Sequence, residues 1–317
     1  MKKRIISVLL ATVFALSVIG CGTKDTKEQD AYRQYGITCM ESGKYEDAVK
    51  AFQNALGESI GHIGEKELDI CFYKAKAQAL DGKTKDALAT YNAIIKYNKD
   101  ARAYYLRGDL YMDMGEEKKG RADFESAVQQ GKKNYEIYIG IYESLSRHEK
   151  KDEGQKYLSA AMEIKGDKPE DELYKGRISY LLGENKDAIS YLEKAKDHKQ
   201  MLASYYLGLA YDANGDSDKA KKCIAEYIKS GVATSYDLYE LGMQEMQDGN
   251  YKNALTYFNS GLELEKVPNK QNLMKSAIAA YEYSGDFDSA KKMMKEYLKA
   301  YPDDEEAKHE NTFLETR

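Results

Sequence analysis

Few side chains in this sequence could do chemistry, and they are not spaced for a reaction. The chain of 317 residues has four histidines, at positions 62, 148, 198 and 309, and no two lie one helical turn apart. This excludes a zinc-binding histidine pair on one helix. A phosphate-binding glycine loop with its lysine, a nucleophile elbow and a paired-cysteine motif are also absent. We therefore predict a protein that is not an enzyme and that carries no cofactor.

Three carboxylates are the best candidates for a metal site. Asp109 and Asp113 are four positions apart, so on a helix they share one face, and Glu143 would lie near them if successive helical units stack in order. Carboxylate oxygens of this kind suit a divalent cation. However, the chain is acidic, with a formal net charge of -5 at pH 7, and charged helix faces are usually solvated surface. A solvated face is the favoured interpretation, and we predict no metal.

In the N-terminal segment one cysteine directly follows an apolar stretch and a small residue. It reads MKKRIISVLLATVFALSVIGCG, a basic start and an apolar stretch from Ile5 to Ile19 that ends at Gly20 and Cys21. The stretch is shorter than the roughly 17–25 residues of a spanning helix and fits the middle of an export signal. The alternative is an uncleaved membrane anchor with an incidental cysteine. We interpret the other cysteines as small buried side chains and not as a disulfide framework: Cys39, Cys71 and Cys223.

The elements that would position any site are helical repeats. Residues 43–52 read GKYEDAVKAF and residues 249–258 read GNYKNALTYF, with glycine, tyrosine, alanine and phenylalanine in the same places. A small residue followed four positions later by a large apolar one recurs with a nearly fixed period, at Ala48, Ala87, Gly120, Gly154, Ala188, Ala220, Ala254 and Ala290. The period, about 34 residues, indicates about two helices of three to four turns per unit. Three prolines lie between units, where a helix must stop: Pro169, Pro268 and Pro302.

Two sets of glycines keep the register of these small residues. The first set stands twelve positions earlier, and we expect it to let two helices approach closely: Gly36, Gly108, Gly176, Gly208 and Gly242. The second stands five positions earlier, and we expect it in the turn between the helices, where a positive φ costs glycine little: Gly43, Gly82, Gly115, Gly183, Gly215, Gly249 and Gly285.

This pattern resembles the tetratricopeptide repeat, whose consensus runs W-x-x-L-G-x-x-Y, then A-x-x-x-F, A and P. The seventh repeat shows it well, with Leu238, Leu241, Gly242, Gly249, Tyr251, Ala254, Phe258 and Gly261. The fourth departs from it, because Tyr142 and Gly154 replace the usual glycine and alanine, and no repeat has a tryptophan. The resemblance implies an all-α fold, a solenoid of about eight helix-turn-helix repeats forming a right-handed superhelix.

The segment Val18-Ile19-Gly20-Cys21 resembles a bacterial lipobox, in which the cysteine becomes the new N-terminus and carries lipid such as palmitate. Two or more acyl chains would hold the protein stably on a membrane. We therefore expect a lipoprotein signal peptide at 1–20, the lipidated Cys21 and a tether at 21–30, the repeat array at 31–302 and a capping helix at 303–317. The expected location is a bacterial cell membrane or envelope, outside the cytoplasm.

In the tetratricopeptide family the first helix of each repeat lines a concave groove. Carrying the family's groove positions over implies a partner-binding groove of Phe72, Arg102, Tyr105, Met112, Leu173, Arg177, Tyr180, Tyr205, Leu209, Tyr236, Tyr239, Met243, Met246 and Tyr283. Exposed apolar clusters usually mark interaction surfaces, and tyrosine and methionine are favoured in them. The alternative is that these side chains are buried against one another.

Together the two resemblances imply a membrane-anchored extracytoplasmic lipoprotein that acts as a protein–protein interaction scaffold or adaptor in the cell envelope. Its partner would be a protein or a peptide, since an acidic chain argues against nucleic acid. The alternative is a receptor for a glycan or small molecule that stacks on Tyr205, Tyr236 and Tyr239. A compact pocket would favour the receptor, and an open trough would favour a peptide.

Overall fold

The computed structural model describes residues 26–59, 63–166 and 168–317 of the chain. Cys21 and the preceding leader, on which the lipid anchor was predicted, lie outside these residues. Within them every regular element is an α-helix, which confirms the all-α repeat fold. The helices are α1 (Thr26–Glu41), α2 (Tyr45–Gly57), α3 (Glu65–Leu80), α4 (Thr84–Asn98), α5 (Ala101–Asp113), α6 (Glu117–Gln130), α7 (Tyr135–Arg147), α8 (Lys151–Met162), α9 (Pro169–Leu182), α10 (Asn185–Asp197), α11 (Leu202–Ala213), α12 (Ser217–Lys229), α13 (Ser235–Gln247), α14 (Tyr251–Leu262), α15 (Lys270–Tyr283), α16 (Phe287–Ala300) and α17 (Glu305–Glu315).

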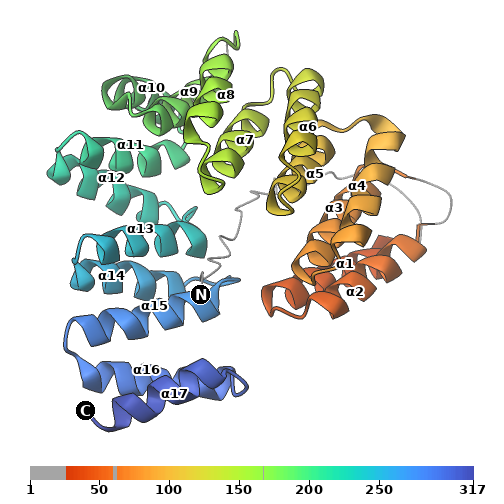
Figure 1. Cartoon of the computed structure of the whole chain (residues 1–317). Helices are drawn as coiled ribbons and strands as arrows, with labels where there is room; N and C mark the ends of the chain where they lie inside the picture. Colours follow the sequence, from red (N-terminus) through yellow and green to blue (C-terminus); the bar gives the residue numbers. More distant parts are fainter. Residues whose placement is uncertain (1–25, 60–62, 167) are drawn as a thin grey trace. The chain divides into compact units, whose positions relative to one another are not determined.

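The helices form hairpins that fall into two compact units, divided after Val232. The first unit holds α1 to α12, and the second holds α13 to α17. Within a hairpin the two helices run antiparallel, as for α1 with α2 and α13 with α14 (Figure 1). In the second unit α17 follows the last hairpin and buries Ala307 and Leu314 in one cluster with Met294 and Tyr297 of α16. The divisions at residues 20, 30 and 302 stay predictions.

The glycine of the first helix lets the two helices of a hairpin approach, as predicted. A methyl group added at Gly242 would lie 2.2 Å from Cε1 of Phe258, the large residue of the second helix. Such a contact is closer than side-chain carbons tolerate, so a larger residue at Gly242 would force the helices apart. The same relation joins Gly36 to Phe52 and Gly176 to Leu192.

The fourth hairpin solves the same packing problem with the sizes exchanged. Tyr142 stands on α7 where most hairpins have glycine, and Gly154 stands opposite on α8 where most have alanine. A methyl group added at Gly154 would lie 3.1 Å from Cδ2 of Tyr142. The tyrosine is 7% exposed, and its hydroxyl donates to the carbonyl oxygen of Leu181 at 3.4 Å. In this hairpin the small residue is on the second helix and the large residue is on the first. The space that Tyr142 fills is therefore provided by Gly154.

The turn between the two helices uses a left-handed residue. The seven glycines predicted there have φ between 70° and 85°, which confirms the prediction. The fourth hairpin has Glu149 at this place, and its φ is 61°. A side chain in this region strains the backbone, so this turn is less favourable than its counterparts.

Candidate functional site

The first helices of the hairpins carry all the residues of the predicted groove. In the first unit these are Phe72 on α3, Arg102, Tyr105 and Met112 on α5, Leu173, Arg177 and Tyr180 on α9, and Tyr205 and Leu209 on α11. In the second unit they are Tyr236, Tyr239, Met243 and Met246 on α13, and Tyr283 on α15.

Four of these side chains fill space between helices. Tyr105, Met112, Leu173 and Tyr205 are between 2% and 9% exposed. The Tyr105 ring reaches the next hairpin, where its Cζ would lie 2.6 Å from a methyl group added at Gly140. These four are buried, but against residues outside the predicted groove, such as Gly140 for Tyr105 and Tyr227 for Tyr205, and not against one another as the alternative interpretation has it.

Other groove residues of the first unit keep accessible surface. Phe72, Tyr180 and Leu209 are half-buried, and the Arg102 side chain is 54% exposed. The Arg102 guanidinium lies over the Phe72 ring, 4.5 Å from its centre, while it also pairs with Asp100 at 2.9 Å. A guanidinium held over an aromatic face presents both a cation and apolar area.

In the second unit α13 holds a row of half-buried groove residues. Tyr239, Met243 and Met246 follow one another at helical spacing and pack by one side against the cluster that contains Phe258. Tyr283 on α15 is 68% exposed, and its ring stacks on Tyr251 with 5.3 Å between ring centres. These side chains combine a fixed inner side with an open outer side.

Ion pairs join consecutive first helices of the first unit. Arg33 on α1 pairs with Asp69 on α3 at 2.7 Å. Arg177 on α9 reaches back to α7, where it lies 2.9 Å from Glu143 and 3.4 Å from Glu136. Burial raises the pKa of Glu143, although Arg177 opposes this shift. For Arg177 burial lowers the pKa, but Tyr206 and the two carboxylates together raise it above its ordinary value.

The candidate metal cluster is built differently from the prediction. Asp109 and Asp113 are joined by His148, with possible ligand atoms within 4.8 Å of one another, while Glu143 pairs with Arg177. The His148 Nε2 lies 3.2 Å from Asp113. The Arg147 guanidinium already contacts Asp109 at 2.5 Å, and a bound cation would have to displace it. The cluster therefore has the character of an ion-pair group.

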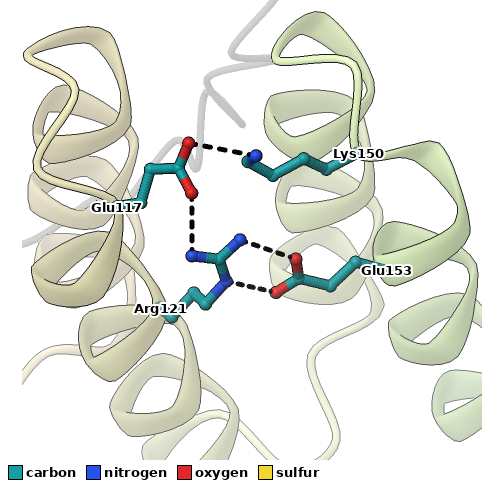
Figure 2. Close-up of polar contacts among 4 residues, drawn as sticks. All are labelled: Glu117, Arg121, Lys150 and Glu153. Carbon is teal, nitrogen blue, oxygen red and sulfur yellow. Dashed lines mark hydrogen bonds and ion pairs between the residues drawn. The ribbon is translucent and has the colours of Figure 1, made fainter.

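The second helices α6 and α8 are joined by a second network (Figure 2). Arg121 of α6 contacts both carboxylate oxygens of Glu153 on α8, at 2.8 and 3.0 Å. Glu117 accepts from Arg121 and from Lys150, each at 3.0 Å. An open cavity of about 350 Å³ beside this network is lined by equal numbers of acidic and basic residues. Its balanced charge offers no preference for a charged ligand.

An acidic cavity of about 290 Å³ lies among α15, α16 and α17. Its carboxylates are Glu282, Glu306 and Glu310, and its lysine, Lys275, lies 2.8 Å from Asp304. Burial and the neighbouring Glu310 raise the pKa of Glu282 to about 7. Two carboxylates that face each other favour retaining one proton between them.

Sequence reasoning missed one residue on the predicted groove side of the first helices. Lys76 on α3 holds the place in its helix that Arg177, Leu209 and Met243 hold in theirs, eleven positions before the recurring small residue. Its side chain is half-buried. The groove positions of the family include the one that Lys76 occupies, so applying them to every repeat would have identified Lys76.

Models of the tetratricopeptide repeat match the chain in four segments. One model matches residues 36–95 and 74–135, and a second matches residues 202–230 and 271–304. Together these segments cover about half of the chain. The chain belongs to the tetratricopeptide repeat family. The match begins in the first hairpin and ends just before α17, so the family accounts for hairpins in both units.

Two solved structures align with most of the chain. A protein of this family from Parabacteroides merdae is 12% identical, with 80% of this chain and 99% of that chain covered and a TM-score of 0.47. PilW, a type IV pilus biogenesis factor, is 18% identical, with 66% and 97% covered and a TM-score of 0.44. No curated protein matches the chain.

Within the residues that the structure describes, no helix is both long and apolar enough to cross a membrane.

Proposed function

We propose that this tetratricopeptide repeat protein is a lipid-anchored scaffold outside the cytoplasm of a bacterial cell and that it binds a peptide segment or a protein through its first helices. Tetratricopeptide repeat proteins are generally scaffolds for protein interactions. The observation that carries the proposal for this chain is the row Tyr239, Met243 and Met246 on α13, which is fixed on one side and accessible on the other. Tyrosine and methionine are enriched at the cores of interfaces.

The anchor rests on the leader sequence. The basic start, the short apolar stretch and the terminal Gly20-Cys21 support export and lipidation at Cys21.

The scaffold is favoured over the glycan receptor. The receptor would use Tyr205, whose side chain is 8% exposed. Its ring is packed by Tyr206 and Tyr227, with ring centres 5.1 and 5.3 Å away. A sugar stacks on an open aromatic face, which Tyr205 does not offer.

The binding surface is tested by affinity capture from solubilised membranes with the full-length lipidated chain. The Tyr239→Ala/Met243→Ala variant should keep the helical circular dichroism of the parent and lose the captured partner. The matched control is Leu255→Ala/Tyr257→Ala, which removes two half-buried side chains from α14 of the same hairpin. The control should capture as much partner as the parent. If Tyr239→Ala/Met243→Ala also captures as much partner as the parent, the first-helix surface is not the binding site.

The anchor is tested by fractionation of cells that express the Cys21→Ser variant. We expect the parent in the membrane fraction with incorporated palmitate, and the variant without the label and released from membranes after export. A variant that stays in the membrane would favour the uncleaved anchor instead.

A further inference from the structure

Four charged residues occupy the same position in consecutive first helices of the first unit. They are Lys76 on α3, Asp109 on α5, Glu143 on α7 and Arg177 on α9. Asp109 pairs with Arg147 at 2.5 Å, and Glu143 pairs with Arg177 at 2.9 Å. Three of the four charges are therefore compensated by neighbouring helices.

Lys76 differs from these residues because it forms no ion pair or hydrogen bond with any residue that the structure describes. Its side chain is half-buried, and burial alone lowers its pKa, with no carboxylate acting against the shift. An ammonium group that is partly removed from water without a counterion is unfavourable. By contrast, each arginine of the described first unit contacts a carboxylate.

The neighbours of Lys76 along α3 are apolar groups with accessible surface. Phe72 is one turn before it and lies under the Arg102 guanidinium at 4.5 Å. Leu80, one turn after it, is 39% exposed. Residues four apart share a helix face, so Phe72, Lys76 and Leu80 form one stripe about 12 Å long. The stripe has a cation at its centre and an apolar group at each end.

We propose that Lys76 is an anion-binding subsite on the first helices of the first unit: it binds a carboxylate or phosphate group of a peptide segment whose flanking apolar side chains lie on Phe72 and Leu80. The inference rests on the proposed peptide-binding function and adds the charge of the partner. An anion brought to Lys76 would supply the counterion that the protein lacks there. A charged hydrogen bond at a partly desolvated site should strengthen binding about tenfold.

The test uses immobilised peptides of about nine residues, which span about 30 Å when extended. Each peptide carries glutamate, glutamine or phosphoserine at its centre between varied apolar residues. The full-length chain should retain glutamate- or phosphoserine-centred peptides about tenfold more strongly than glutamine-centred ones. The relative strength of the two acidic sets identifies the anion as carboxylate or phosphate.

Lys76→Met, which keeps the length and apolar stem of the side chain, should lose this preference. Lys85→Met is the matched control, since Lys85 is an exposed lysine on α4, and it should keep the preference. In the parent, side-chain NMR should show the pKa of Lys76 rising on addition of a retained acidic peptide and staying unchanged with its glutamine counterpart.

The outcomes separate this inference from the function on which it rests. If no peptide is retained by the parent, peptide binding fails and the anion subsite fails with it. If peptides are retained but Lys76→Met keeps the preference for an acidic centre, only the subsite is refuted. The same holds if retention by the parent does not depend on the central residue.

Discussion

Arg177 is a predicted groove residue whose charge could either bind a partner or stabilise the packing of α7 and α9, and its substitution tests which of these it does. Its side chain is 17% exposed and pairs with Glu143 and Glu136. The guanidinium also lies over the Tyr206 ring, 5.5 Å from its centre. We expect Arg177→Met to destabilise the first unit, because it removes the ion-pair partner of the partly buried Glu143. Arg147 also acts on Glu143, but it is itself paired with Asp109.

The magnitude follows from the burial of the pair. Removing one partner of a fully buried ion pair costs about 3–5 kcal/mol of unfolding free energy. The Glu143 side chain is 38% exposed, so solvent screens part of this loss, and we expect about 2 kcal/mol. Replacing Glu143 by glutamine in the same chain should recover about half of it, because the unpaired charge is then gone.

The pH dependence gives a second, independent readout. Burial raises the pKa of Glu143 in the folded state, and the loss of Arg177 would raise it further. An acid whose pKa is higher in the folded than in the unfolded state binds more protons when folded, so its contribution to stability falls as pH rises. The defect of Arg177→Met should therefore be larger at pH 7.5 than at pH 5.

Urea unfolding followed by circular dichroism at the two pH values measures these effects. Arg121→Met is the matched control, since its pairs with Glu117 and Glu153 lie on the second helices and its side chain is 34% exposed, against 17% for Arg177, and it should cost under about 1 kcal/mol. If Arg177→Met is as stable as the parent at pH 7.5, the ion pair does not hold α7 and α9, and Arg177 is free for a ligand.

Two further predictions concern the turns and the second unit. Glu149→Gly should raise the unfolding free energy by about 1 kcal/mol in urea, because glycine adopts the positive φ of this turn without strain, whereas Gly183→Ala should lower it. The pKa of Glu282 is raised to about 7, so parent stability should fall by about 1 kcal/mol between pH 5 and pH 8, after allowance for solvent screening. Glu282→Gln should remove this dependence, and Glu306→Gln, whose side chain is 89% exposed, should retain it; an unchanged pH profile in Glu282→Gln would contradict the assignment.

Much of the fold could be predicted because most hairpins repeat the same steric requirement. A glycine at the position of Gly242 and a large apolar residue at the position of Phe258 recur in register in five hairpins, and the structure shows why, since no methyl group fits between them. The exchange of Tyr142 and Gly154 could not be interpreted in the same way. A consensus judges each position separately, whereas packing depends on the combined volume of two facing residues.

The groove was less predictable, because exposure depends on the neighbouring hairpin. Tyr105 occupies a groove position, yet its ring enters the space left by Gly140, and it is 9% exposed. Phe72 occupies the same position one hairpin earlier and remains half-buried under Arg102. Position within a repeat predicts which helix carries a residue, but the size of the residues on the next hairpin decides whether a partner can reach it.

Charge pairing follows the repeat period and explains why Lys76 stands apart. Glu143 and Arg177 are separated by close to one repeat along the chain, and so are Arg33 and Asp69. Asp113 lies at a similar separation beyond Lys76, but it lies 3.2 Å from His148 instead. A separation of about one repeat therefore identifies which charged residues could form an ion pair, but not which of them do. Of the four charged residues at this position, Asp109, Glu143 and Arg177 pair with neighbouring helices. The ammonium group of Lys76 is the one left for a partner to bind.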